Sequence, residues 1–96
     1  MSVDSIYALE EAIKTENLLK RHNLNKIGVF GSFARGEKAN DIDFYIDEDG
    51  YALENLIGLQ KDLERITEME VDIMLKEYAN PIVLYRAGRD MKYVTQ

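Results

Sequence analysis

Cysteine and tryptophan are absent from this chain of 96 residues, and proline occurs once. Without cysteine there is no disulfide framework and no cysteine-ligated zinc site, which fits the reducing cytoplasm that we expect as its location. No uninterrupted apolar run is long enough to span a bilayer, so we expect no membrane association. The first residues, Met1-Ser2-Val3-Asp4, lack the basic and apolar regions of a secretory signal.

Basic residues are also few. Twelve Lys and Arg stand against eighteen Asp and Glu, which gives a formal net charge of −6. Direct binding to nucleic acid is not expected, because a nucleic-acid duplex requires a basic surface. A nucleotide ligand is not excluded, since metal ions can screen a triphosphate from carboxylates.

The length and a hydrophobic content of 46% predict a single domain, residues 1–96, with a small core. Apolar periodicity predicts long helices at 3–22 and 52–66, strands at 26–31, 41–46 and 70–75, a short helix after Pro81 that ends at Gly88, and an edge strand at 91–94. This order predicts an α/β (α+β) fold in which a small mixed sheet carries helices packed on one face.

Three aspartates lie in the predicted second and third strands. Asp41 and Asp43 alternate with apolar residues and share one face of the second strand, and Asp72 lies in the third. If those two strands are neighbours, all three carboxylates converge, and each raises the pKa values of the others. A divalent cation removes this repulsion, and oxygen ligands favour a hard ion such as Mg²⁺.

Gly31-Ser32, directly after the first strand, supplies a candidate phosphate contact. Glycine lets the backbone approach a ligand closely, and the Ser32 hydroxyl can donate to a phosphate oxygen. A helix beginning here would favour anions at its N-terminus. The P-loop pattern is absent. Arg35 could meet a phosphate or could pair with a nearby carboxylate, and the sequence leaves the two alternatives about even.

Each of these motifs alone is common and has a structural explanation. A single Asp-x-Asp usually marks a turn or a strand end, and Asp72 by itself could be a solvated strand residue. Their combination favours metal and nucleotide binding, because folding gives little reason to place three aspartates on one face of adjacent strands.

These motifs resemble the minimal nucleotidyltransferase (MNT) domains of the DNA polymerase beta-like superfamily. The resemblance covers residues 26–75 and rests on Gly31-Ser32-Phe33-Ala34-Arg35-Gly36-Glu37, Asp41-Ile42-Asp43-Phe44 and Val71-Asp72-Ile73. It implies a polymerase-beta-like fold and a nucleotidyltransferase that uses ATP as substrate with two Mg²⁺ ions.

The resemblance also implies residue roles and a partner. Asp41, Asp43 and Asp72 would be the catalytic metal ligands, while Gly31 and Ser32 would hold the β- and γ-phosphates; Arg35 is a further candidate nucleotide contact on the residues alone. Small MNT proteins often act as antitoxins beside a HEPN ribonuclease toxin, and some transfer AMP from ATP to a tyrosine of that toxin. A toxin-antitoxin role with a HEPN-type partner, in the cytoplasm, is therefore the implied function.

Two features depart from the family pattern. Only eight residues separate Ser32 from Asp41, which is shorter than is usual, and Asn40 stands where the family commonly has serine. A non-catalytic antitoxin that neutralises a toxin by contact is therefore an alternative. Another is the catalytic subunit of a small-molecule nucleotidyltransferase with a separate substrate-binding subunit.

The apolar stretch Ile82-Val83-Leu84-Tyr85 could dock on the sheet or on a partner, which makes a homo-oligomer or heterocomplex plausible.

Overall fold

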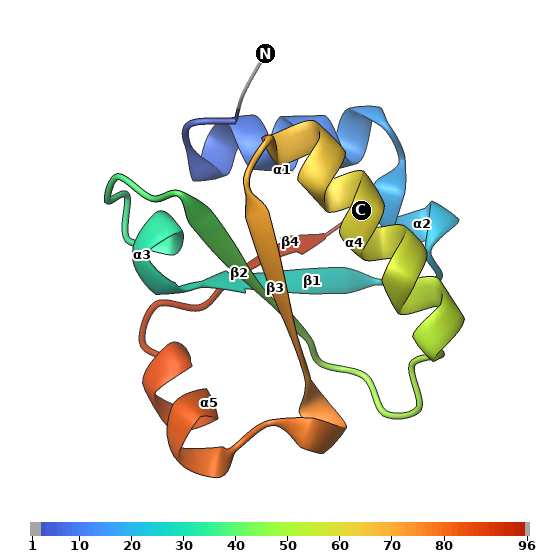
Figure 1. The fold of residues 1–96 in the computed structure, drawn as a ribbon, viewed down its shortest axis with the longest axis vertical. Helices are drawn as coiled ribbons and strands as arrows, with labels where there is room; N and C mark the ends of the chain where they lie inside the picture. Colours follow the sequence, from blue (N-terminus) through green and yellow to red (C-terminus); the bar gives the residue numbers. More distant parts are fainter. Residues whose placement is uncertain (1–2, 96) are drawn as a thin grey trace.

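The computed structural model describes residues 3–95 and has the mixed α/β architecture that the sequence predicts (Figure 1). The helices are α1 (Ile6–Thr15), α2 (Leu18–Arg21), α3 (Gly31–Ala34), α4 (Leu53–Thr67) and α5 (Pro81–Ala87), with a 3₁₀ turn η1 (Lys76–Tyr78). The strands are β1 (Lys26–Phe30), β2 (Asp41–Ile46), β3 (Glu70–Leu75) and β4 (Lys92–Thr95). None of the helices within residues 3–95 is long and apolar enough to cross a membrane.

The prediction of one helix over residues 3–22 is wrong, because the structure has two helices there. Asn17 takes a left-handed conformation with φ 55°, which ends α1 and directs the chain into α2. Asparagine tolerates this conformation better than most residues do. The break turns Leu18 and Leu19 into the core, where both are fully buried.

The sheet has the order β3-β2-β1-β4 and is mixed. Strand β1 pairs antiparallel with both β2 and β4, whereas β2 and β3 run parallel. The parallel pair requires a crossover, and α4 provides it. Figure 1 shows α4 lying along the same side of the sheet as α1 and α2.

The core lies between these helices and one face of the sheet. Alternate residues of the central strands point into it, as the sequence pattern predicts for Ile42, Phe44 and Ile46. The fully buried large side chains are Leu9, Ile13, Leu18, Leu19, Ile27, Val29, Ile42, Phe44, Ile46, Leu59, Leu63 and Val94. Helix α5 lies apart from this layer, at the lower left in Figure 1.

The opposite face of the sheet is only partly open. A Cβ atom on Gly28 would lie 2.6 Å from the Met91 sulfur and 3.2 Å from a ring carbon of Tyr93, so the end of the chain covers β1 closely there. Tyr45 on this face is consequently 3% exposed. The surface that stays exposed around Asp41 and Asp43, at the other end of β2, is therefore smaller than the alternation of β2 alone predicts.

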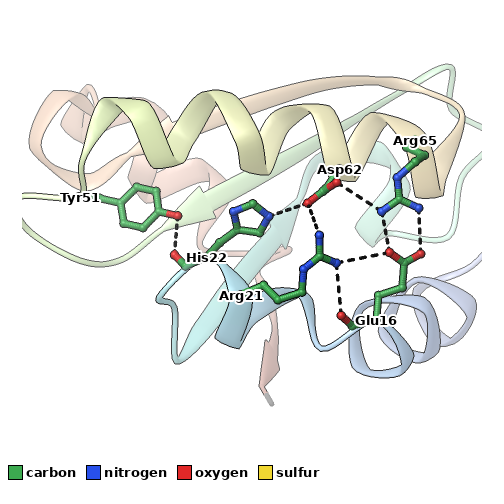
Figure 2. Close-up of polar contacts among 6 residues, drawn as sticks. All are labelled: Glu16, Arg21, His22, Tyr51, Asp62 and Arg65. Carbon is green, nitrogen blue, oxygen red and sulfur yellow. Dashed lines mark hydrogen bonds and ion pairs between the residues drawn. The ribbon is translucent and has the colours of Figure 1, made fainter.

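A polar network joins α2 to α4 on the outer side of the helical layer (Figure 2). The His22 Nε2 atom lies 2.7 Å from an Asp62 oxygen, and the Arg21 guanidinium donates to the same carboxylate at 3.1 Å. Arg65 pairs with Glu16 at 2.5 Å. The hydrogen bond to Asp62 from His22 and those from arginine hold its pKa below the usual range against the opposing effect of burial.

Gly58 in α4 lies next to the His22 ring, and it provides a stability prediction. An added Cβ would lie 3.5 Å from the His22 Cε1 atom, which is an ordinary van der Waals contact. Because glycine disfavours a helix interior, Gly58→Ala is expected to raise the free energy of unfolding by about 0.5–1 kcal/mol. Urea denaturation measures the change. Gly58→Val is the control, since its larger side chain must displace His22, and a loss of stability in the alanine variant would contradict the prediction.

Candidate functional site

Three residues form a row across the sheet, on the face opposite the core. Phe30 of β1 is opposite Asp43 of β2, and Asp43 is opposite Asp72 of β3. Asp41 lies two residues earlier on the same face of β2, opposite Glu70. The structure thus brings Asp41, Asp43 and Asp72 to neighbouring positions, as the sequence predicts if β2 and β3 are adjacent.

The environment of Asp43 differs from that of an ordinary surface carboxylate. Its side chain is half-buried, whereas Asp41 and Asp72 are exposed. Burial raises the pKa of Asp43, and the charges of Asp41 and Asp72 raise it further. Asp43 therefore carries its negative charge at an energetic cost that a bound cation would relieve.

The Gly31 turn lies directly against this carboxylate. Gly31 has φ +79°, and a Cβ atom built on it would lie 2.5 Å from an Asp43 side-chain oxygen. A side chain at this position would therefore both strain the backbone and displace Asp43. Glycine is required here for its conformation and for the close approach of Asp43, which the sequence motif alone does not reveal.

A helix contributes little to phosphate binding at this turn. The helix that follows the first strand is α3, which begins at Gly31 and has only four residues. Its dipole is accordingly small, so the Gly31 backbone and the Ser32 hydroxyl are the phosphate-binding groups that the local structure offers. Ser32 is half-buried at the start of α3, next in the chain to Gly31.

The three carboxylates are chemically suited to bind a divalent metal ion, but they do not already surround a single point. Among residues 3–95, no three His, Cys, Asp or Glu side chains already converge on a point that could hold a metal ion. The carboxylates of Asp41, Asp43 and Asp72 are oxygen ligands, which suit Mg²⁺. Asp41 and Asp72 are exposed, whereas Asp43 is half-buried between them.

Arg35, the predicted nucleotide contact, is paired with carboxylates. Its guanidinium donates to Glu37 at 2.8 Å and to Asp90 at 2.7 Å. These partners raise the pKa of Arg35, so it is charged at every ordinary pH. Of the two alternatives for Arg35, pairing with carboxylates is the one realised here, and contact with a phosphate stays a prediction.

Two hollows flank Phe30 on this face. One is lined by Phe30, Asp72 and Tyr78, together with Ile73, Met74 and Leu75. The other lies between α3 and α5 and is lined by Gly31, Arg35 and Arg86, among others. Sequence reasoning missed Tyr78 and Arg86, because no motif or periodicity links η1 and α5 to the Gly31 turn.

Comparison with known proteins agrees with this geometry. Residues 13–95 match the family model described as polymerase beta, nucleotidyltransferase. The chain is 31% identical to the protein adenylyltransferase MntA of Thermococcus cleftensis over 97 residues, which cover 98% of this chain and 97% of the relative.

Solved structures show the same fold. A chain described as a minimal nucleotidyltransferase superposes with a TM-score of 0.72 and 29% identity, covering 96% of this chain and 95% of that one. A chain of the MntA–HpeT toxin-antitoxin complex has a TM-score of 0.68 and 21% identity, covering 85% of this chain and 69% of that one. The family match extends over the Gly31 turn and over all three aspartates. This chain therefore belongs to the polymerase beta nucleotidyltransferase family, and it is a nucleotidyltransferase of the minimal, MntA-like type.

Proposed function

We propose that this protein transfers AMP from ATP to a tyrosine hydroxyl of a HEPN-type toxin and thereby acts as an antitoxin. The observation that carries the proposal is the pairing of Asp43 with Asp72 next to the Gly31 turn. The full-length similarity to a protein adenylyltransferase supports AMP transfer to a protein. The structural likeness to a chain of a toxin-antitoxin complex supports the toxin as partner.

Asp41, Asp43 and Asp72 would hold the two Mg²⁺ ions. When bound, these ions neutralise phosphate charge and favour an in-line displacement. Burial and then the charges of Asp41 and Asp72 raise the pKa of Asp43, and a bound cation would offset this cost.

The other residues bind and orient the reactants. The Gly31 backbone and the Ser32 hydroxyl would bind phosphate oxygens of ATP. Asp72 would accept the proton of the acceptor hydroxyl, whose oxygen forms a bond to the α-phosphorus. The bond between that phosphorus and the oxygen bridging to the β-phosphate breaks, and pyrophosphate leaves. Catalysis on this scheme consists mainly of positioning and charge neutralisation.

An exposed apolar surface beside the site favours a protein acceptor over a small molecule. Tyr78 of η1 and Ile82, Val83 and Tyr85 of α5 are between 48% and 78% exposed. Large apolar side chains gathered on one segment are typical of interaction surfaces. The same observation favours a second candidate, an antitoxin that neutralises its partner by contact alone.

Labelled ATP separates these functions. The purified protein is incubated with α-labelled ATP, Mg²⁺ and a lysate of the source cells, beside an Asp43→Asn variant and a γ-labelled control. A protein band labelled only from the α-position, and only by the wild type, is the expected result. A labelled small molecule would point instead to a small-molecule acceptor. If no labelled product depends on Asp43, the proposed AMP transfer is overturned. The antitoxin that acts by contact alone is then the function that remains.

A further inference from the structure

We infer that Arg86 of α5 binds the β- and γ-phosphates of the nucleotide, and that Arg35 instead holds α3 in place. This inference rests on the proposed use of a nucleoside triphosphate at the Gly31 turn. It assigns a binding role to a residue outside every motif of the sequence.

The first argument is position. Arg86 lines the hollow between α3 and α5 together with Gly31 and Phe30. Phe30 is in the same row of the sheet as Asp43 and Asp72. Figure 1 shows α3 and α5 near the same end of the sheet, and the hollow between them is where a nucleotide bound at the Gly31 turn would lie.

The second argument is charge. The Arg35 guanidinium already contacts two carboxylates, those of Glu37 and Asp90, so this group of three side chains has a net charge of −1. A triphosphate approaching Arg35 would have to displace one of them. The guanidinium of Arg86 forms no ion pair and no hydrogen bond to any residue in the range 3–95. It is therefore the arginine lining this hollow that can donate to phosphate oxygens without losing a partner.

The third argument is the contrast with the other arginine near the end of α5. The Arg89 guanidinium lies over the Tyr85 ring, 5.7 Å from its centroid, and Arg89 does not line the hollow. The two residues are three positions apart, are both exposed and carry the same charge. Arg89 is therefore a matched control for any effect of net charge.

The experiment measures nucleotide affinity without turnover. Isothermal titration of the full chain with α,β-methylene ATP and with AMP, both in Mg²⁺, gives two dissociation constants for each variant. Arg86→Ala is expected to weaken binding of the ATP analogue about tenfold, since a charged hydrogen bond is lost, and to change AMP binding little. Arg86→Lys is expected to retain part of the affinity. Arg89→Ala is expected to match the wild type, and thermal unfolding checks that each variant is folded.

Two results would overturn the inference. Equal affinity of wild type and Arg86→Ala for the ATP analogue would remove Arg86 from the site, and so would an equal loss for AMP and the analogue. Binding of the analogue by the wild type is required by the proposed function itself. If the wild type fails to bind the analogue, both proposals fail. If the wild type and Arg86→Ala bind it equally well, only this inference is overturned.

Discussion

The Asp43→Asn variant is expected to lose transferase activity by at least about 10²–10³-fold while keeping the fold intact. The activity is expected to fall because Asp43 lies next to both Asp41 and Asp72 in the proposed metal site, and metal-ion charge stabilisation is worth several kcal/mol of the barrier. The fold is kept because the ionised Asp43 is held at a cost: burial and the charges of Asp41 and Asp72 all raise its pKa.

The sign of the stability effect follows from this pKa. Because the folded protein raises the pKa of Asp43 above its unfolded value, the folded state favours the protonated form. The resulting contribution to stability is full below the unfolded pKa and is lost as the pH rises through the folded pKa. At neutral pH without metal, Asp43→Asn is therefore expected to unfold at the same or a higher temperature than the wild type. The difference should shrink as the pH falls through the folded pKa and should vanish below the unfolded value of about 4.

Magnesium is expected to reverse the order of the two proteins. A ligand that binds only the folded state stabilises it by about 2.7 kcal/mol at one hundred times its dissociation constant. Thermal unfolding with and without Mg²⁺ should show a rise for the wild type and none for Asp43→Asn. Asp49→Asn, at an exposed turn position, is the control for a change of one charge and should keep the metal response. An Asp43→Asn protein that remains active would place the metal site elsewhere.

The Gly31→Ala variant is expected to lose both stability and activity. Its positive φ of +79° costs about 1–3 kcal/mol for a residue with a side chain. The added Cβ would in addition meet the Asp43 carboxylate at 2.5 Å and push it away. A displacement near 1 Å at a reacting centre reduces activity about 10²-fold.

Gly50→Ala separates backbone strain from displacement of Asp43. Gly50 also has a positive φ, of +71°, but nothing lies within 4 Å of its added Cβ. Thermal unfolding and α-labelled ATP turnover are measured for both variants. Gly50→Ala is expected to lose stability through backbone strain alone, Gly31→Ala is expected to lose at least as much, and activity is expected to be lost only in Gly31→Ala. Equal activities would show that the contact between Gly31 and Asp43 does not position the carboxylate.

Local sequence patterns predicted most of the secondary structure. Strands β2 and β3 begin and end at the predicted residues, and the helix after Pro81 is present. Alternation predicts which side chains share a face, because it depends only on the pleat of the strand. The break at Asn17 was not predicted, since the apolar spacing on both sides continues with a helical period and only the core decides where the helix must turn.

The sequence by itself determined most of the helices and strands, the apolar faces and the motif that places Gly31 and the aspartates in one family. Only the tertiary structure decided that β2 and β3 lie side by side, which is what brings Asp72 next to Asp43. It also decided that Arg35 pairs with Asp90 and that Arg86 reaches the hollow beside Gly31. Local periodicity carries no information about such neighbours, because strand order and helix placement depend on which surfaces the whole chain can bury together.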